Sequence, residues 1–203
     1  MALGARYRDK VEDALLSELS AVGYTRYRKE WVDWPLSKDF HAWVGLNNGV
    51  YRDHVQFEPF VGIHSPPLMR LASEVDGRRY SRSTATYAIH MGEIAPHEKL
   101  FRFDEATDIE AEAKRLARLY RTIGMDYSRS LASYEVLLPL FRENIKFLGG
   151  YPDRYAVCLH LLGRDEEAIA FVKECTQKEP DYMSRFAEGF LRYLEEHRRA
   201  SMH

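Results

Sequence analysis

The residues with the clearest chemical potential lie in the segment DHVQFEPFVGIHS, residues 53–65. It contains His54, Glu58 and His64, which are residue types that bind metal ions or transfer protons. In an extended strand, residues four positions apart are separated by about 13 Å. His54 and Glu58 therefore cannot bind one ion from a straight strand.

Histidines on neighbouring strands offer a second route to a metal site. His41, His64 and His90 each lie on the polar face of a predicted strand, so a suitable register would bring them together. The segment HMGEIAPHE, residues 90–98, lacks the helical spacing of zinc proteases and contains a proline. We predict no metal and no cofactor, and keep a small metal-dependent enzyme using the three histidines as an alternative.

Other catalytic signatures are missing from the sequence. It contains no G-x-S-x-G segment and no glycine-rich loop of the kind that holds nucleotide phosphates. Cys158 and Cys175 have neither C-x-x-C spacing nor an electropositive context that would lower the pKa of a thiol. The pattern favours a protein without catalytic residues.

The first half of the chain shows the periodicity of a helix followed by strands. Apolar residues at helical spacing predict a helix over residues 6–22, with Gly23 as its C-terminal stop. Alternation predicts strands in FHAWVGLN (40–47) and VQFEPFVGIH (55–64), and further candidate strands are YTRYRKEWV (24–32), TATYAIHMG (84–92) and KLFRF (99–103). NNG at residues 47–49 is typical of a turn, and Pro59 indicates an edge position or a bulge. Ser65-Pro66-Pro67 ends its strand and precedes a short helix.

The second half reads as helical. Thr107 and Glu110 have capping-box spacing ahead of one helix. A second helix over about residues 129–147 contains Pro139, which predicts a kink or a break at that residue. Gly149-Gly150 marks a break, and further helices are predicted at 153–162, 165–178 and 181–198.

Together these patterns predict an α+β fold. It has an N-terminal helix and an antiparallel sheet of about four strands in residues 1–103, followed by a C-terminal helical bundle in residues 104–203. We expect the helical region to pack on the sheet as one compact unit.

Composition excludes several classes of protein. The chain of 203 residues has a net charge of −2, which gives no electrostatic reason to expect a nucleic-acid partner. No stretch approaches the roughly 20 apolar residues that cross a bilayer, and the charged N-terminal segment is unlike a signal peptide. With only two cysteines as well, we expect a cytoplasmic protein with reduced thiols.

Four segments in the N-terminal half resemble a bacterial domain family of unknown function. They are VGY (22–24), KEW (29–31), FHAWVGLN (40–47) and FEPFVGIHS (57–65). In that family a helix precedes an antiparallel sheet, and similar α+β domains with helical tails recur among immunity proteins of bacterial toxin systems. The resemblance implies a toxin domain as protein partner and assigns no catalytic residue.

Residues 152–180 resemble one tetratricopeptide-like helical hairpin. The resemblance depends on small Ala156, the segment GRDEEAI (163–169) with Ala168, small Cys175 and the terminating Pro180. It implies an adaptor that binds a peptide. Such arrays need about three stacked units, and no second copy is in register, so a single hairpin completing a core is the other interpretation.

A candidate partner-binding surface follows from the polar face of the predicted strands. That face carries His41, Trp43, Glu58, Phe60 and His64. Either helices cover it, or it is an exposed patch with the composition of a protein interface.

The acidic run with Asp104, Glu105 and Asp108 is a second candidate contact. Our leading hypothesis is an immunity protein that blocks the active site of a cognate toxin. The identity of the partner and the oligomeric state are left open.

Overall fold

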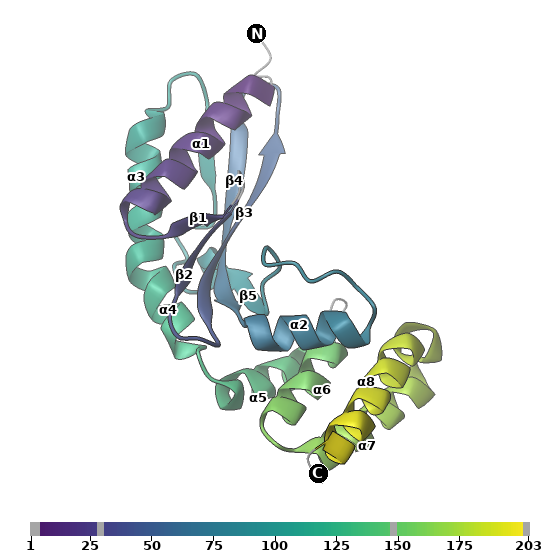
Figure 1. The fold of residues 1–203 in the computed structure, drawn as a ribbon. Helices are drawn as coiled ribbons and strands as arrows, with labels where there is room; N and C mark the ends of the chain where they lie inside the picture. Colours follow the sequence, from purple (N-terminus) through teal and green to yellow (C-terminus); the bar gives the residue numbers. More distant parts are fainter. Residues whose placement is uncertain (1–4, 28–30, 147–149, 201–203) are drawn as a thin grey trace. The chain divides into compact units, whose positions relative to one another are not determined.

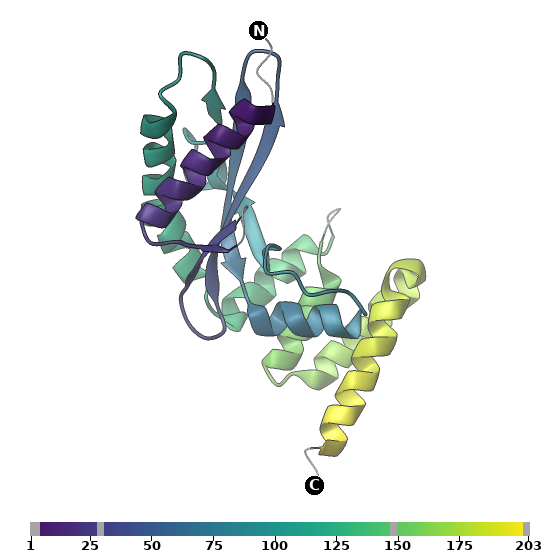
Figure 2. The ribbon, with the colours of Figure 1, turned by 45° about the horizontal axis from the view of Figure 1, so that its top comes forward.

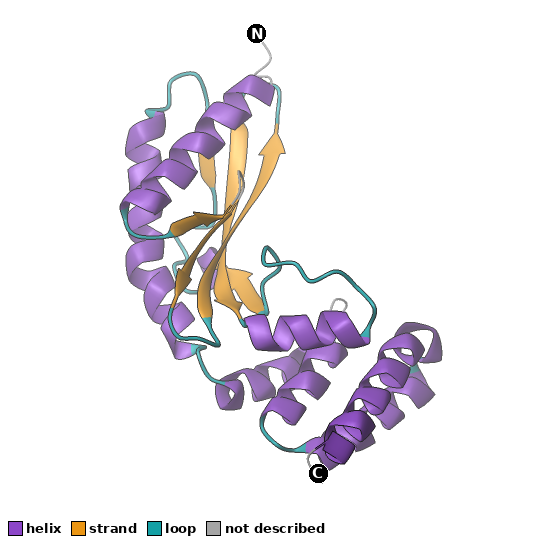
Figure 3. Cartoon of the chain, in the orientation of Figure 1, coloured by secondary structure: helices purple, strands orange, loops and turns teal. Residues whose placement is uncertain are grey.

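The computed structural model describes residues 5–27, 31–146 and 150–200 and has the predicted α+β class (Figures 1 and 3). Its contacts divide the chain into two compact units. The sheet unit comprises Met1–His64 and Tyr87–Ala132, and the helical unit comprises Ser65–Thr86 and Ser133–His203. The observed boundaries differ from the predicted division at residue 103, because residues 104–132 belong to the sheet unit.

The sheet unit contains six strands in the sheet that the structure describes, rather than about four. The strands run antiparallel in the order β1-β2-β3-β4-β5, and β6 pairs with β4 beside β5. The elements are α1 (Ala5–Ala21), β1 (Thr25–Tyr27), β2 (Trp31–Pro35), β3 (His41–Val50), β4 (Val55–His64), β5 (Tyr87–His90), a 3₁₀ turn (Met91–Glu93), β6 (Phe101–Phe103), α3 (Ile109–Leu119), a π-helical turn (Tyr120–Gly124) and α4 (Met125–Ser130).

The core of the sheet unit lies between one face of the sheet and its helices. Figures 1 and 2 show α1 and α3 side by side along that face. Leu15 and Leu19 of α1 are fully buried in the same apolar cluster as Phe57 of β4 and Leu116 of α3. The helix stop at Gly23 is confirmed, since this residue has a φ of 108°.

The alternation of β4 is confirmed by its burial. Val55, Phe57, Val61 and Ile63 are all fully buried. This regular period of two explains why the strand could be recognised from sequence.

Pro59 lies within a central strand, where a proline is normally excluded. Tyr51 donates its N–H to the carbonyl of His54 at 2.8 Å, so these two residues form a hydrogen-bonded pair. Hydrogen-bonded and non-hydrogen-bonded pairs alternate along an antiparallel ladder, which makes Leu46 and Pro59 a non-hydrogen-bonded pair. The backbone nitrogen of Pro59 therefore points away from β3. On that side β6 pairs with residues 55–57 and β5 with residues 60–63. Pro59 therefore lies in the gap between them, and its missing N–H costs no ladder hydrogen bond.

Two local predictions are wrong. The segment NNG does not turn, because β3 continues to Val50 and the chain reverses at residues 51–54. Thr107 does not cap a helix: Asp108 is the N-cap of α3 and accepts a hydrogen bond from the N–H of Ala111 at 3.1 Å. A strand pairing along its whole length with β4 outweighs local turn propensity.

The predicted helix over 129–147 is interrupted before its proline. The described chain has α4 ending at Ser130 and a separate helix α5 (Tyr134–Asn144), whose N-cap Ser133 accepts from the N–H of Val136. Pro139 lies inside α5, which continues from Tyr134 to Asn144, so the helix is not broken at the proline. The predicted break at Gly149-Gly150 falls partly outside the described residues, since Gly149 is not among them.

Tyr120 joins the helical layer to the two central strands. Its fully buried hydroxyl lies 2.9 Å from the carbonyl oxygens of both Gly45 on β3 and Phe60 on β4, and donates to them. Its own carbonyl accepts from the hydroxyl of Tyr24 at 3.1 Å. Burial raises the pKa of the Tyr120 hydroxyl well above its ordinary value, so it stays a proton donor.

The helical unit consists, in its described part, of α2 (Pro66–Val75), α5, α6 (Pro152–Leu161), α7 (Asp165–Lys178) and α8 (Pro180–Ala200). The predicted start of α2 is confirmed, with Ser65 as its N-cap. α8 passes very close to the end of α2, because a Cβ placed on Gly189 would lie 1.8 Å from the carbonyl oxygen of Val75. Of the described helices, none has both the length and the apolar character needed to cross a membrane.

Substituting Tyr120→Phe should lower the free energy of unfolding of the sheet unit by about 1–2 kcal/mol, since two buried carbonyls lose their shared donor. Urea denaturation followed by tryptophan fluorescence measures this unit alone, because all three tryptophans lie within residues 31–43. The matched control is Tyr51→Phe, at a tyrosine that is 50% exposed. Equal stability of both variants would contradict the assigned role.

Substituting Gly189→Ala should destabilise the helical unit by roughly 1–3 kcal/mol, since the added methyl group forces α8 away from α2. Thermal unfolding followed by far-UV circular dichroism measures the loss. The control is Glu188→Ala at the neighbouring exposed position, where helix propensity alone predicts no loss. A Gly189→Ala protein that melts like wild type would show that the two helices are not held at this distance.

Candidate functional site

The strand register brings the predicted polar-face residues onto one surface of the sheet unit. His41 lies opposite His64, Trp43 opposite Gly62, and Phe60 opposite Gly45. Glu58 lies opposite Asn47 on the same face. The apolar cluster with α1, α3 and α4 occupies the other face. We call the surface with Trp43, Glu58, Phe60 and His41 the polar sheet face.

Two aromatic side chains meet at a glycine on this face. A Cβ built on Gly45 would lie 2.3 Å from the ring of Trp43 and 3.1 Å from the Cβ of Phe60. Gly45 therefore leaves the space that the indole ring fills. Trp43 and Phe60 are half-buried, and the ring of Phe60 contacts that of His90 edge-to-face at 5.1 Å between centroids.

The two opposed histidines lie deeper than sequence alone indicates. His64 is fully buried and His41 has a side chain that is 14% exposed, with 6.4 Å between the two ring centroids. Nδ1 of His41 lies 3.1 Å from Oδ2 of the buried Asp33. His64 is therefore inaccessible to a partner, whereas part of the His41 ring is accessible at the edge of the face.

The histidines predicted as metal ligands do not converge. His90 lies opposite Phe60, four residues along β4 from His64, which is a separation of about 13 Å. Within residues 5–27, 31–146 and 150–200, no group of three or more His, Cys, Asp or Glu side chains could hold a metal ion. The register removes the geometry that the three-histidine site requires.

His54 lies in the turn between β3 and β4 rather than on the strand. Its ring stacks on Tyr51 at 4.5 Å, and its Nδ1 lies 2.8 Å from Oδ1 of Asp53. This hydrogen bond is the main cause that lowers the pKa of Asp53. The cluster orders the tip of the hairpin.

The acidic run divides into structural and exposed members. Asp104 accepts hydrogen bonds from the hydroxyl of Thr107 at 2.9 Å and the N–H of Ala106 at 3.0 Å, which lower its pKa. Asp108 caps α3. Glu105 is exposed and has no structural role of this kind in the described part of the chain.

The helical unit contains a pocket that the sequence did not indicate. Its volume is about 440 Å³, and it lies among the end of α2, the first turn of α6 and the first turns of α8. Its lining residues are Asp76, Arg78, Asp153, Asp181, Tyr182, Met183, Arg185 and Phe186. Tyr182 and Arg185 lie outside the apolar stripe of α8, and only tertiary contacts bring them next to residues 76–78.

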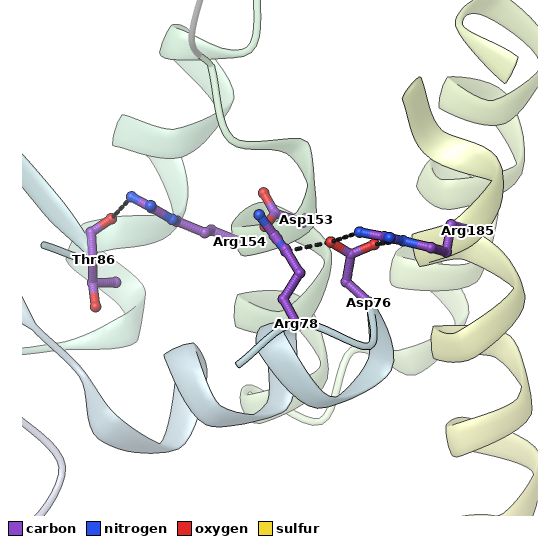
Figure 4. Close-up of polar contacts among 6 residues, drawn as sticks. All are labelled: Asp76, Arg78, Thr86, Asp153, Arg154 and Arg185. Atoms are coloured by element: carbon purple, nitrogen blue, oxygen red, sulfur yellow. Dashed lines mark hydrogen bonds and ion pairs between the residues drawn. The ribbon is translucent and has the colours of Figure 1, made fainter. Parts of the chain in front are cut away.

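An ion-pair cluster organises one wall of this pocket (Figure 4). Arg185 binds Asp76 through two hydrogen bonds, from Nε at 3.0 Å and from Nη2 at 3.1 Å. Arg78 also pairs with Asp76 through Nε, and its Nη2 lies 3.0 Å from Oδ2 of Asp153. A carboxylate at the C-cap of α2 faces the negative end of the helix dipole, and the two guanidiniums compensate for this.

Arg154 follows Asp153 on α6, and its side chain extends away from this cluster toward Thr86 (Figure 4). It is 7% exposed, donates from Nη1 to the carbonyl of Thr86 at 2.8 Å, and has its guanidinium 3.5 Å from the ring centroid of Tyr151. Burial lowers its pKa, and the nearby Asp153 opposes this. Arg154 therefore adds a buried positive charge next to the carboxylate of Asp153.

The helical hairpin predicted at 152–180 is formed by α6 and α7, which pack against each other. Ala156 and Ala168 are fully buried, as close packing of the two helices requires. The predicted helices at 153–162, 165–178 and 181–198 are confirmed within one or two residues. The kinship with tetratricopeptide repeats stays a prediction.

Comparison with protein-family models, with curated proteins and with solved structures gives no match.

The two thiols should differ in reactivity. Burial, together with the charge of Glu135, raises the pKa of Cys158 to about 12, so at pH 8 only about one thiol in ten thousand is ionised. We expect the native Cys175→Ser variant to react with a thiol-specific disulfide reagent only after denaturant is added. The native Cys158→Ser variant, which retains the half-buried Cys175, should react faster. Rapid labelling of native Cys158 would contradict its burial.

Proposed function

We propose that the protein binds a protein partner through the polar sheet face. The observation that supports this is that two half-buried aromatic side chains, Trp43 and Phe60, both border Gly45 on the face opposite the core. Aromatic side chains that are already held in place lose little conformational entropy when a partner covers them. Glu58 beside them supplies a charge that can fix the orientation of the partner.

Most concretely, the partner is a bacterial toxin whose active site the protein blocks. The resemblance of residues 22–65 to immunity-associated domains supports this, as does the exposed acidic Glu105. Acidic side chains on one partner speed its association with a basic surface on the other. Inhibition is steric and requires no chemistry by the immunity protein.

Co-expression tests this function directly. The product of the neighbouring gene should arrest bacterial growth when expressed alone, and the wild-type protein should restore growth. The Phe60→Ala variant should lose at least tenfold in affinity for that product, since a central aromatic contact is removed. Ile123→Ala is the control, because this apolar residue is 42% exposed and lies in the π-helical turn, in the helical layer on the other side of the sheet.

Circular dichroism of the Phe60→Ala variant must first show a folded protein. A neighbouring gene product that is not toxic, or that does not bind, excludes the immunity function. Equal loss of affinity in the Phe60→Ala and Ile123→Ala variants would exclude the polar sheet face as the contact.

A second candidate function is peptide binding by the helical unit. The pocket of about 440 Å³ between α2, α6 and α8 favours it, because a cavity of this size accommodates one or two side chains of an extended peptide. This function corresponds to the adaptor predicted from residues 152–180, although the pocket uses α2 and α8 as well as α6.

A further inference from the structure

We propose that the pocket of the helical unit binds an acidic side chain of a partner peptide between Arg78 and Arg185, with a neighbouring apolar side chain of the peptide against Tyr182. This inference depends on the peptide-binding function proposed above and adds the chemistry of the ligand. Four observations on the described residues support it: the exposure of the charges, the remaining hydrogen-bond donors, the aromatic neighbour and the apolar floor.

The positive groups of the cluster are at the surface and the negative groups lie beneath them. The side chains of Arg78 and Arg185 are 54% and 69% exposed, whereas that of Asp76 is 12% exposed. The side chain of Asp153 is 16% exposed. A partner that approaches this wall of the pocket therefore meets guanidinium groups first. Figure 4 shows Asp76 between the side chains of Arg78 and Arg185.

Both guanidiniums keep donors for a ligand. A guanidinium carries five N–H groups in a planar fork. The contacts to Asp76 and Asp153 involve Nε and Nη2 of Arg78, and the contacts to Asp76 involve Nε and Nη2 of Arg185. In the described part of the chain, no contact involves Nη1 of either arginine. The carboxylates hold the two forks in place, which reduces the entropy lost when a ligand carboxylate binds.

Tyr182 provides the neighbouring aromatic surface. It is 65% exposed and precedes Arg185 by three positions on α8, so the two side chains lie on the same side of the helix. Tyrosine and arginine are the residue types enriched at binding hot spots. Their adjacency fits a ligand that presents a carboxylate and an apolar group together.

The floor of the pocket is apolar. Met183 and Phe186 are 2% and 3% exposed, and both line the pocket. Asp181 also lines it and is exposed, so the formal charge of the lining is slightly negative. Long-range attraction therefore contributes little, and selectivity for an acidic side chain comes from short charge-assisted hydrogen bonds to the two arginines.

Selection from a phage-displayed library of random short peptides on the full chain tests the proposal. The enriched peptides should carry Asp or Glu next to Leu, Ile or Phe. Fluorescence polarisation with a synthetic copy of an enriched peptide then gives its affinity. Replacing the acidic residue of that peptide by its amide should weaken binding roughly tenfold, since one charge-assisted interaction is lost.

Variants of the protein locate the site. Arg185→Ala and Arg78→Ala should each weaken binding of the acidic peptide roughly tenfold. The matched control is Arg192→Ala, an exposed arginine of the same helix that does not line the pocket, and it should leave the affinity unchanged. The amide form of the peptide requires no variant, so the test holds even if one arginine variant fails to fold.

The outcomes separate this inference from the function on which it depends. Enriched peptides that are neutral or basic, or that bind equally well to Arg185→Ala, overturn the acidic ligand and leave peptide binding in place. A selection that enriches no peptide overturns both. An acidic peptide that loses affinity in all three variants alike overturns the assignment to this pocket.

Discussion

The hydroxyl of Tyr120 is the contact on which the order of the sheet unit depends. It bonds to carbonyl oxygens of both central strands, and its own residue begins the π-helical turn between α3 and α4. A wider helical turn changes the direction in which the following side chains point. Ser128 of α4 then reaches the carbonyl of Gly62 at 2.8 Å, so the helical layer is bonded to β4 at two places.

The opposite face of the sheet lies outside the apolar cluster of this unit. All the helices described for the sheet unit pack on one side, so the polar sheet face owes its composition to something other than the core. The ring of Trp43 lies over Gly45, outside the apolar cluster. A large aromatic ring at such a position is energetically unfavourable unless a partner or another surface covers it. The buried Asp33 and the partly buried His41 keep the edge of this face polar.

In the helical unit the notable feature is a cluster of charged side chains rather than an aromatic surface. Gly189 lets α8 approach the end of α2, and this approach carries Arg185 to Asp76. A mostly buried carboxylate needs such partners, because leaving it unpaired would cost far more than a surface ion pair contributes. The consequence is a pair of guanidiniums held at the rim of a pocket, where they have capacity for further hydrogen bonds.

The sequence by itself determined those features that depend on local periodicity: the first helix with its stop at Gly23, the alternating strand from Val55 to Ile63, and the last three helices. These patterns repeat over many residues, so neighbouring positions agree with one another. Single-residue signals were less reliable. Thr107 was predicted to cap α3, but Asp108 is the N-cap. NNG was predicted to turn, but these residues pair with β4, because long strand pairing outweighs a small local preference.

Only the tertiary structure decided which distant residues meet. The strand register set His90 opposite Phe60 rather than near His64, and a shift of a few residues along the strand would have given a different cluster. The pocket combines residues 76–78, 153 and 181–186, whose proximity depends on how closely three helices approach. Periodicity determines which face of an element is buried, but the position of one element against another depends on side-chain packing across long separations in sequence.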